Sequence, residues 1–431
     1  MNRFLFSILI VLIFIGCQQK SDHQGIAFST YDQFLSEQVR SGHAVGVHGF
    51  VFQDGKVVYE KTYGLRDREA ADSMHGDELY FLQSMTKPIV SVALMTLYEE
   101  GKFQLDDPVS KYLPEFKSEQ VVNDPTKGST SGTHPATTEM TIRQLLSHTS
   151  GMTHGIAPIA YDKEIWNKII LDTTIKTVGN RVSALAKMPL MFDPGSRWAY
   201  SFSPDVVARL IEVLSGKTVA EYLQEKIFDP LGMKETGYNL TEAQQRRVMS
   251  VYAFGADSTL HRVEKQPRMI GNTIFAGVNA LFASTKDYLT FAAMLLNNGE
   301  WNGKRIVKPE TMALMTTDQT TALKTKLDTT DIYTPLVNGL VRDSLGSLNL
   351  EPGYGFGLGF AMLQDPVMVG RKDIAKGEFF WGGANSTFFF VNPGKKLIGI
   401  FMTQVASVGV PNPYHFYFCD QMRKTIYEDV K

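Results

Sequence analysis

The chain has 431 residues, of which 43% are hydrophobic and 20% are charged, and its formal net charge is −2. This length buries a large core in one large domain or two closely packed ones, and the composition is ordinary for a soluble globular protein. The nearly balanced charge, without a basic run, argues against nucleic acid as a partner.

The start of the chain predicts a signal peptide over residues 1–16. Arg3 precedes an apolar run, residues 4–16, that is too short for a transmembrane helix and is typical of a secretory signal. The end of this run, FIGC at residues 14–17, resembles the lipobox of bacterial lipoproteins. That resemblance implies cleavage before Cys17 and acylation of this cysteine. The alternative is an ordinary signal peptide with an incidental cysteine.

A lipidated Cys17 sets the expected location of the protein. Acyl chains hold a protein at a membrane surface, so we expect an exported protein anchored in the bacterial cell envelope, on the periplasmic or surface side. In a Gram-negative host we expect the outer membrane, with residues 17–28 as a polar tether. Cys419 is then left without a disulfide partner and is expected to be a buried apolar side chain.

The first predicted elements are a hairpin and a buried helix. Between Ala44 and Tyr63, two runs rich in β-forming residues flank Asp54-Gly55, a strong hairpin signal. The stretch from Phe81 to Gly101 is apolar on almost every side, which suits a buried helix. Pro88 is tolerated in a first helical turn and Gly101 is a helix stop, so this helix begins close to Ser84.

Ser84 and Lys87 form a Ser-x-x-Lys pair at the head of that helix. Residues three apart share a helix face, so Lys87 Nζ can reach Ser84 Oγ. The helix dipole favours anionic character at the serine, and apolar neighbours lower the pKa of the lysine toward that of a usable base. A serine beside a base can act as a nucleophile. Since this spacing also arises by chance, the rest of the chain has to decide.

The middle of the chain predicts a mostly helical segment. Tyr200 lies in an extended loop directly before a helix that Ser203 caps, that Pro204 begins and that Gly216 ends. If a nearby ammonium lowers its pKa, Tyr200 can be a second base. Further helices are expected over residues 141–147, 221–228 and 284–298, and two polar segments, 117–139 and 316–350, are expected to be irregular loops that shape the cleft.

The C-terminal part turns rich in strands, which are expected over residues 354–363, 378–393 and 396–404 before a final helix over 413–427. Strands at both ends with helices between predict an α+β fold: one antiparallel sheet built from both chain ends, flanked by helices, with an inserted helical subdomain. The expected globular domain is 29–431, with a sheet subdomain over 29–83 and 350–431 and a helical subdomain over 84–349.

Glycines inside the predicted strand at residues 378–393 point to the second half of a site. Trp381-Gly382-Gly383 precedes Ala384, and glycines within a strand indicate close approach by a ligand or by another backbone. A strand edge at this place can donate a backbone N–H to a developing oxyanion.

Together these pieces resemble the serine β-lactamase and penicillin-binding-protein superfamily, in particular its class C-like branch with the family VIII carboxylesterases. The resemblance runs from about residue 30 to the end, and it is carried by SMTK at 84–87, LLSHTSGM at 145–152, YSF at 200–202, DPLGM at 229–233, GLGF at 357–360 and WGG at 381–383. It implies a serine β-lactamase/transpeptidase-like fold without metal or organic cofactor.

The resemblance also implies roles for particular residues. Ser84 is the residue that is acylated, and Lys87 and Tyr200 share proton transfer as general bases, with the identity of the acylating base open. The backbone N–H groups of Ser84 and Ala384 form the oxyanion hole. His148 belongs to a block that is structural in this superfamily, and no zinc-type spacing of histidines is present.

Two departures from class C β-lactamases bear on the substrate. Phe202 replaces the asparagine of Tyr-x-Asn, and Trp381, Gly382 and Gly383 replace Lys-Thr-Gly in the cleft. The missing lysine removes a cation that would hold a substrate carboxylate, so a serine hydrolase acting on small carboxylic esters is expected. A D-amino-acid peptidase or weak β-lactamase acting on cell-wall-type substrates is the first alternative. A non-catalytic binding lipoprotein is the second.

Overall fold

The computed structural model describes residues 28–324, 334–337, 340–342, 348–371, 374, 376–407 and 412–430. The predicted signal peptide, Cys17 and the tether up to residue 27 lie outside the described residues, so export and lipid attachment stay predictions. Among the described helices, none is long and apolar enough to cross a membrane.

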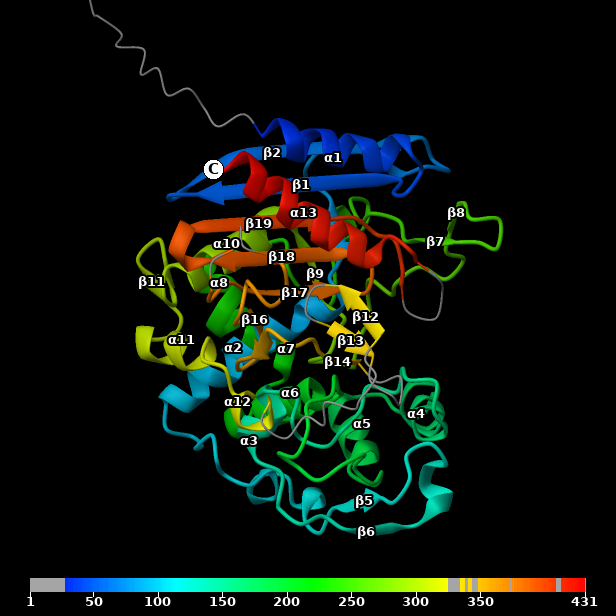
Figure 1. Cartoon of the computed structure of the whole chain (residues 1–431), viewed down its shortest axis with the longest axis vertical. Coiled ribbons are helices and arrows are strands. Elements are labelled where there is room, and N and C mark those ends of the chain that lie inside the picture. The colour runs from blue at the N-terminus through cyan, green and yellow to red at the C-terminus, as the bar shows by residue number, and fades with distance from the viewer. Residues whose placement is uncertain are drawn as a thin grey trace, which may run out of the picture.

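Both ends of the chain build one eight-stranded antiparallel sheet, which confirms the predicted α+β architecture (Figure 1). The strand order is β15-β16-β17-β18-β19-β1-β2-β3. The two ends of the chain meet where β1 pairs with β19, from His48 opposite Met402 to Gln53 opposite Leu397. The strands are β1 (Gly46–Gln53), β2 (Lys56–Asp67), β3 (Asp72–Ser73), β15 (Tyr354–Phe356), β16 (Ala361–Leu363), β17 (Phe379–Gly383), β18 (Thr387–Asn392) and β19 (Leu397–Met402).

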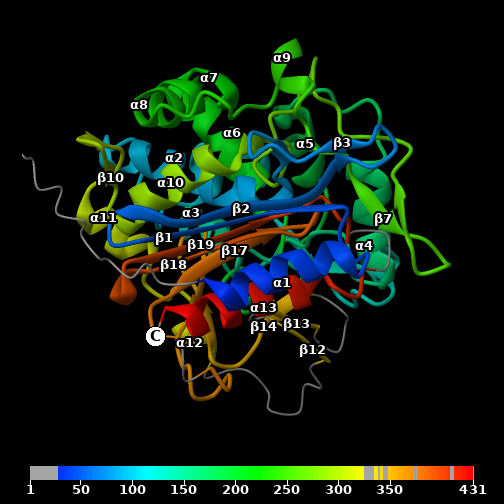
Figure 2. The same cartoon turned by 90° about the horizontal axis from the view of Figure 1, so that it is seen from above.

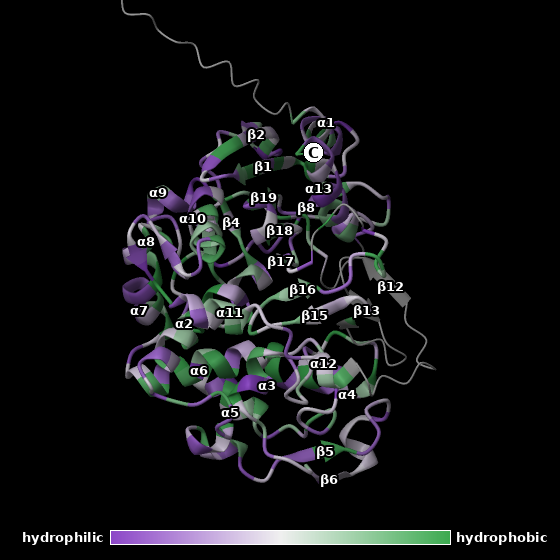
Figure 3. Cartoon of the chain, turned by 60° about the vertical axis from the view of Figure 1, so that its left-hand side comes forward, coloured by the Kyte–Doolittle hydropathy of each residue, from purple (hydrophilic) through white to green (hydrophobic). Residues whose placement is uncertain are grey.

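Helices cover both faces of this sheet. Figure 2 shows α1 (Ser29–Arg40) and α13 (His415–Asp429) on one face, and α10 (Thr285–Leu296) and α2 (Thr86–Glu99) on the other. Every residue of β18 and β19 is therefore buried. Figure 3 shows hydrophobic residues gathered along β1 and α10, while the peripheral α9 (Glu242–Gln245) is hydrophilic.

Helix α1 was not anticipated, and it depends on the far end of the chain. Its first backbone N–H groups, at Thr30 and Tyr31, donate to the carboxylate of Asp429 at 3.2 and 2.8 Å. A carboxylate at a helix N-terminus satisfies donors that lack partners within the helix. The last turn of α13 thus caps the N-terminus of α1.

The predicted hairpin is confirmed, because Asp54 (φ 50°) and Gly55 (φ 84°) both adopt the left-handed conformation that a tight two-residue turn between β1 and β2 requires. The helix before Gly216 is α6 (Ser203–Ser215), and Gly216 ends it at φ 72°. Ser203 is the first residue of α6 and does not cap it. Its hydroxyl is instead engaged by Ser150 Oγ (2.7 Å) and Ser201 Oγ (2.8 Å).

The prediction that residues 117–139 and 316–350 are irregular is wrong. The first segment contains β5 (Gln120–Val122), η4 (Gly128–Ser131) and β6 (Thr133–Pro135), and the N–H of Val122 donates to the carbonyl of Leu190 at 2.9 Å. Backbone pairing of this kind leaves no period in the sequence. The described parts of the second segment include α12 (Thr321–Lys324) and a small sheet of β12 (Thr334–Val337), β13 (Leu340–Arg342) and β14 (Leu348–Leu350), while residues 316–320 are irregular as expected.

The remaining elements lie mainly in the inserted helical part. The helices are η1 (Gln83–Met85), η2 (Val109–Lys111), η3 (Pro114–Phe116), α3 (Ile142–Leu146), α4 (Ala160–Ile165), η5 (Trp166–Ile170), α5 (Val178–Leu185), α7 (Val219–Leu223), η6 (Gln224–Phe228), α8 (Asp229–Leu231), α11 (Pro309–Met315) and η7 (Pro393–Lys395). The short strands are β4 (Leu79–Phe81), β7 (Tyr252–Phe254), β8 (Leu260–Arg262), β9 (Phe282–Ser284), β10 (Glu300–Trp301) and β11 (Lys304–Arg305).

Candidate active site

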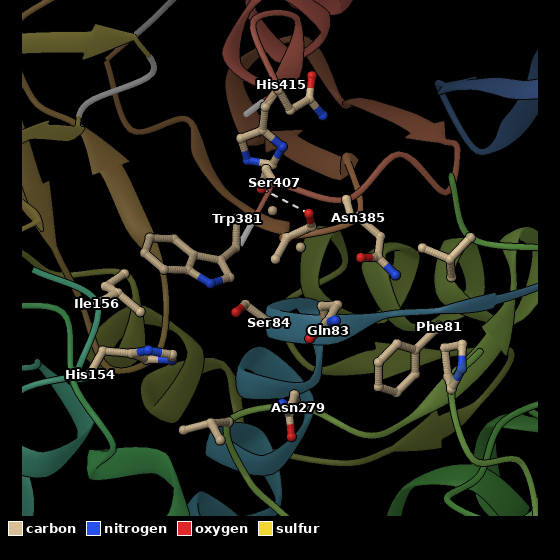
Figure 4. Close-up of a pocket in the computed structure, with 18 of the residues that line it drawn as sticks. Phe81, Gln83, Ser84, His154, Ile156, Asn279, Trp381, Asn385, Ser407 and His415 are labelled. Atoms are coloured by element: carbon tan, nitrogen blue, oxygen red, sulfur yellow. Dashed lines mark hydrogen bonds between the residues drawn. The ribbon is translucent and has the colours of Figure 1, made fainter. Parts of the chain in front are cut away.

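Ser84 lies where η1 passes into α2, at the wall of a cavity of about 680 Å³. The preceding residue, Gln83, has a φ of 51°, an uncommon conformation for a residue other than glycine. Two bonds hold this turn: the Leu82 N–H donates to the carbonyl of Leu281 (2.9 Å), and the Tyr288 hydroxyl donates to the carbonyl of Met85 (3.1 Å). The turn directs Ser84 into the centre of the cavity (Figure 4).

Lys87 follows in the first turn of α2 with only 2% of its surface exposed. Its Nζ donates to Ser84 Oγ at 3.0 Å and to the carbonyl oxygen of Val278 at 2.9 Å. Burial lowers the pKa of Lys87 to about 7, against a smaller opposing effect of the Asp205 carboxylate. Near neutral pH a large fraction of this lysine is therefore the uncharged amine, which can accept a proton.

Tyr200 is the second residue that contacts the Ser84 hydroxyl. Its hydroxyl donates to Ser84 Oγ at 2.6 Å, and Lys87 Nζ lies 4.5 Å from the centroid of its ring. The expectation that a nearby ammonium lowers the pKa of Tyr200 is wrong: burial raises this pKa above its usual value, and the smaller effect of the hydrogen bond to Ser84 does not offset it. Tyr200 is thus a neutral phenol in the resting site.

A buried carboxylate that the sequence did not reveal supports Lys87 indirectly. Asp205, in the first turn of α6, is fully buried, accepts the Val278 N–H at 3.0 Å and pairs with Arg181 at 3.0 Å. The same residue 278 offers its carbonyl to Lys87. An acidic residue is common in the first turn of a helix, so nothing in the sequence indicates that Asp205 organises the site.

The glycines of Trp381-Gly382-Gly383 are required by close packing, as their place in the strand predicted. A Cβ on Gly383 would collide with the carbonyl oxygen of Leu82, next to the turn that carries Ser84. A Cβ on Gly382 would press into the ring of Phe388 at 2.5 Å. The end of β17 therefore lies directly against η1.

Ala384 follows β17 and lines the same cavity as Ser84. Its carbonyl oxygen accepts two hydrogen bonds of 2.8 Å from Ser407, one from the backbone N–H and one from the hydroxyl, which fix the orientation of this turn. The two residues expected to form the oxyanion hole thus face one cavity. Their catalytic role stays a prediction.

Aromatic side chains form the wall around Ser84. Trp381 is 6% exposed and packs edge-on against Phe356 with ring centroids 5.4 Å apart. His154 stacks between Tyr200 and Phe202, 4.8 Å from each ring centroid. Burial lowers the pKa of His154 to about 3, so its imidazole is neutral. Figure 4 shows Trp381 and His154 on one side of Ser84.

His148 takes a supporting position. Its Nδ1 lies 2.8 Å from Ser201 Oγ, and its ring packs among Trp198, Tyr200 and Phe356. Burial keeps the pKa of His148 well below its usual value. Within the described ranges, no group of three or more His, Cys, Asp or Glu side chains is placed to hold a metal ion.

The cleft walls come from segments that the sequence did not single out. None of the described residues in 117–139 or 316–350 lines the cavity, contrary to expectation. Its outer walls are built by η5, α5, residues 251–268 and the described residues of 406–407 and 412–419. Figure 4 shows Ser407 and His415, from the last of these segments, facing Ser84 across Trp381. These segments are distant in sequence and carry no common motif.

Comparisons with known proteins show a matching family model, related sequences and a shared fold. A family model described as Beta-lactamase matches residues 31–418. Protein Rv1367c of Mycobacterium tuberculosis is 28% identical over 387 residues, covering 86% of this chain and 88% of the relative. Esterase EstB of Burkholderia gladioli is 28% identical over 405 residues, covering 89% and 91%. The solved structure of EstCE1, described as a hydrolase with promiscuous acyltransferase activity, shares the fold with a TM-score of 0.72 at 23% identity, covering 93% of this chain and 100% of that one.

We predict that Gly383→Ala lowers kcat/KM by roughly 10²-fold, the order expected for losing one oxyanion donor. The added methyl group would push β17 away from Leu82 and carry the Ala384 N–H with it. Gly179→Ala is the control, because a Cβ there meets Arg209 only at an ordinary 3.5 Å. Thermal unfolding establishes that both variants fold, and unchanged turnover by Gly383→Ala contradicts the close-packing role.

We also predict that kcat/KM depends on one ionisation near pH 7. Below the Lys87 pKa of about 7 the amine is protonated and cannot accept a proton, so activity falls about tenfold for each pH unit and levels off above it. Lys87→Arg stays charged and should be inactive throughout. An acid limb centred near pH 4 instead would identify a carboxylate as the base.

Proposed function

The chain belongs to the beta-lactamase family, as an esterase/β-lactamase-related serine hydrolase, and we propose that it cleaves carboxylic esters through an acyl-enzyme on Ser84. One observation carries the proposal. Ser84 Oγ accepts hydrogen bonds from both Lys87 and Tyr200, in a cavity that Trp381 also lines. In the class C β-lactamases that the chain resembles, a lysine takes the place of this tryptophan. A neutral ester group needs no cation there.

Acylation begins with transfer of the Ser84 hydroxyl proton to the uncharged amine of Lys87. The 3.0 Å separation allows direct transfer, and burial makes the amine available near neutral pH. The serine oxygen then attacks the ester carbonyl, and the C=O electrons move onto its oxygen. The backbone N–H groups of Ser84 and Ala384 receive that oxyanion.

Collapse of this intermediate expels the alcohol. Tyr200 gives its phenol proton to the leaving alkoxide and takes one from the Lys87 ammonium, so no lasting phenolate forms in its apolar surroundings. The raised pKa of Tyr200 favours this relay over a role as a free base. A water molecule activated through Tyr200 and Lys87 then attacks the acyl carbonyl, releases the acid and restores the Ser84 hydroxyl.

The wall of the site and the named relatives support this substrate class. EstB is named an esterase, and EstCE1 is described as a hydrolase. Trp381 and Phe202 face the cavity where polar groups would bind a β-lactam or peptide. Peptidase or weak β-lactamase activity is therefore ranked second, and a purely binding role third.

We predict that the protein hydrolyses 4-nitrophenyl butyrate faster than nitrocefin or a D-Ala-D-Ala peptide. Ser84→Ala should abolish this turnover and labelling by a fluorophosphonate probe, because the nucleophilic oxygen is gone. Intact mass reports the label, and circular dichroism confirms the fold. Full ester turnover by Ser84→Ala would falsify the mechanism, while preference for nitrocefin or the peptide would reverse the substrate ranking.

We further propose that the protein is anchored in the cell envelope through a lipid on Cys17, from the sequence of residues 1–17. Expression with a radiolabelled fatty acid should label the wild type and leave Cys17→Ala unlabelled, with the variant recovered in the soluble fraction. Cys419→Ala is the matched control and should keep the label. Fatty-acid label on Cys17→Ala, or no label on the wild type, would contradict lipid attachment.

A further inference from the structure

The cavity around Ser84 has an unbalanced charge. Among the described residues that line it are three cationic side chains, Arg181, Lys265 and Arg268, and not one Asp or Glu. Low-dielectric walls strengthen the field of such charges inside a cleft. The cavity is therefore apolar at Trp381 and positively charged in another part.

Two of these cations are free to act on a ligand. Arg181 is already paired with the buried carboxylate of Asp205. Lys265 and Arg268 are exposed, and in the part of the chain that the structure describes neither pairs with a carboxylate. The Arg268 Nε donates to the carbonyl of Ile270 at 2.9 Å, which leaves its terminal amino groups available.

The segment that carries both cations is held in place by Gln266. The Oε1 of this side chain accepts the Val251 N–H at 2.8 Å, and its Nε2 donates to the carbonyls of Val251 (3.0 Å) and Val263 (2.7 Å). The Val263 N–H also donates to the Val251 carbonyl at 2.9 Å. These bonds hold the backbone of the segment that places Lys265 and Arg268 at the rim of the cavity.

We propose that Lys265 and Arg268 bind an anionic group of the substrate, so that the natural substrate is an ester with a carboxylate or similar anion away from the scissile bond. This inference rests on the proposed ester hydrolysis at Ser84. The anion meets cations at the rim while the neutral ester lies beside Trp381. A cation beside Ser84 is not needed for this arrangement.

The test compares esters that differ only in charge. Mono-4-nitrophenyl adipate carries an anion on the acyl side, and 4-nitrophenyl hexanoate lacks it. Likewise, 4-(hexanoyloxy)benzoate and its methyl ester place the anion on the alcohol side or omit it. These two pairs distinguish the half of the substrate that carries the charge.

In the variant Lys265→Gln/Arg268→Gln we expect KM for at least one anionic ester to rise about tenfold, as for the loss of two exposed charge contacts. KM for its neutral partner should stay unchanged. Added salt should reduce the wild-type preference, because exposed charges are screened. Lys304→Gln removes an exposed cation on β11 that does not line the cavity, and should change neither value.

Binding of the same esters to Ser84→Ala separates this inference from the proposed function. A tighter Kd for an anionic ester that depends on Lys265 and Arg268 supports the anion site even when the wild type turns over no ester. Equal Kd and KM for charged and neutral esters, or equal losses for both in the double variant, overturn it. The two cations then serve only as solvated surface.

Discussion

The site depends on the cost of burying the amine of Lys87. An ammonium group among apolar side chains lacks the hydration that it has in water, so the structure must either pair it fully or leave it largely uncharged. In this site the amine is partly paired and partly uncharged. The carbonyl of Val278 and the hydroxyl of Ser84 give the amine two hydrogen-bond partners. The Asp205 carboxylate, which accepts the Val278 N–H, favours the charged form of the amine without contacting it directly. The result is an amine whose pKa of about 7 lies at neutral pH.

Much of this arrangement follows from local sequence, and some of it cannot. The spacing of Ser84 and Lys87, the apolar run behind them and the glycines at 382–383 each have a local physical meaning, and the structure brings them together. The Asp205–Val278 bond joins residues 73 positions apart, and its partners look ordinary in sequence. The direction of the Tyr200 pKa shift could not be predicted either. It depends on how deeply the side chain is buried, whereas the sequence indicated only a neighbouring cation.

Trp381 illustrates how one position serves two purposes. Its ring packs against Phe356 and Tyr200, so it belongs to the core, and it also faces the cavity beside Ser84. A lysine there would place a charge against the Tyr200 ring, and the Lys87 amine already lies 4.5 Å from the centroid of that ring. The change from cation to tryptophan therefore reduces electrostatic repulsion of a protonated Lys87 as well as altering what the cleft accepts.

The pairing of β1 with β19 has a consequence for how the protein reaches its native state. Strand β1 pairs with β19, which lies near the end of the chain. The Asp429 carboxylate likewise caps helix α1, which begins at Ser29. Contacts between such distant segments slow folding, because a very long loop must close before they form. The sheet cannot be completed until almost the whole chain has left the ribosome. Packing of the turn that carries Ser84 against β17 is therefore a late, post-translational event.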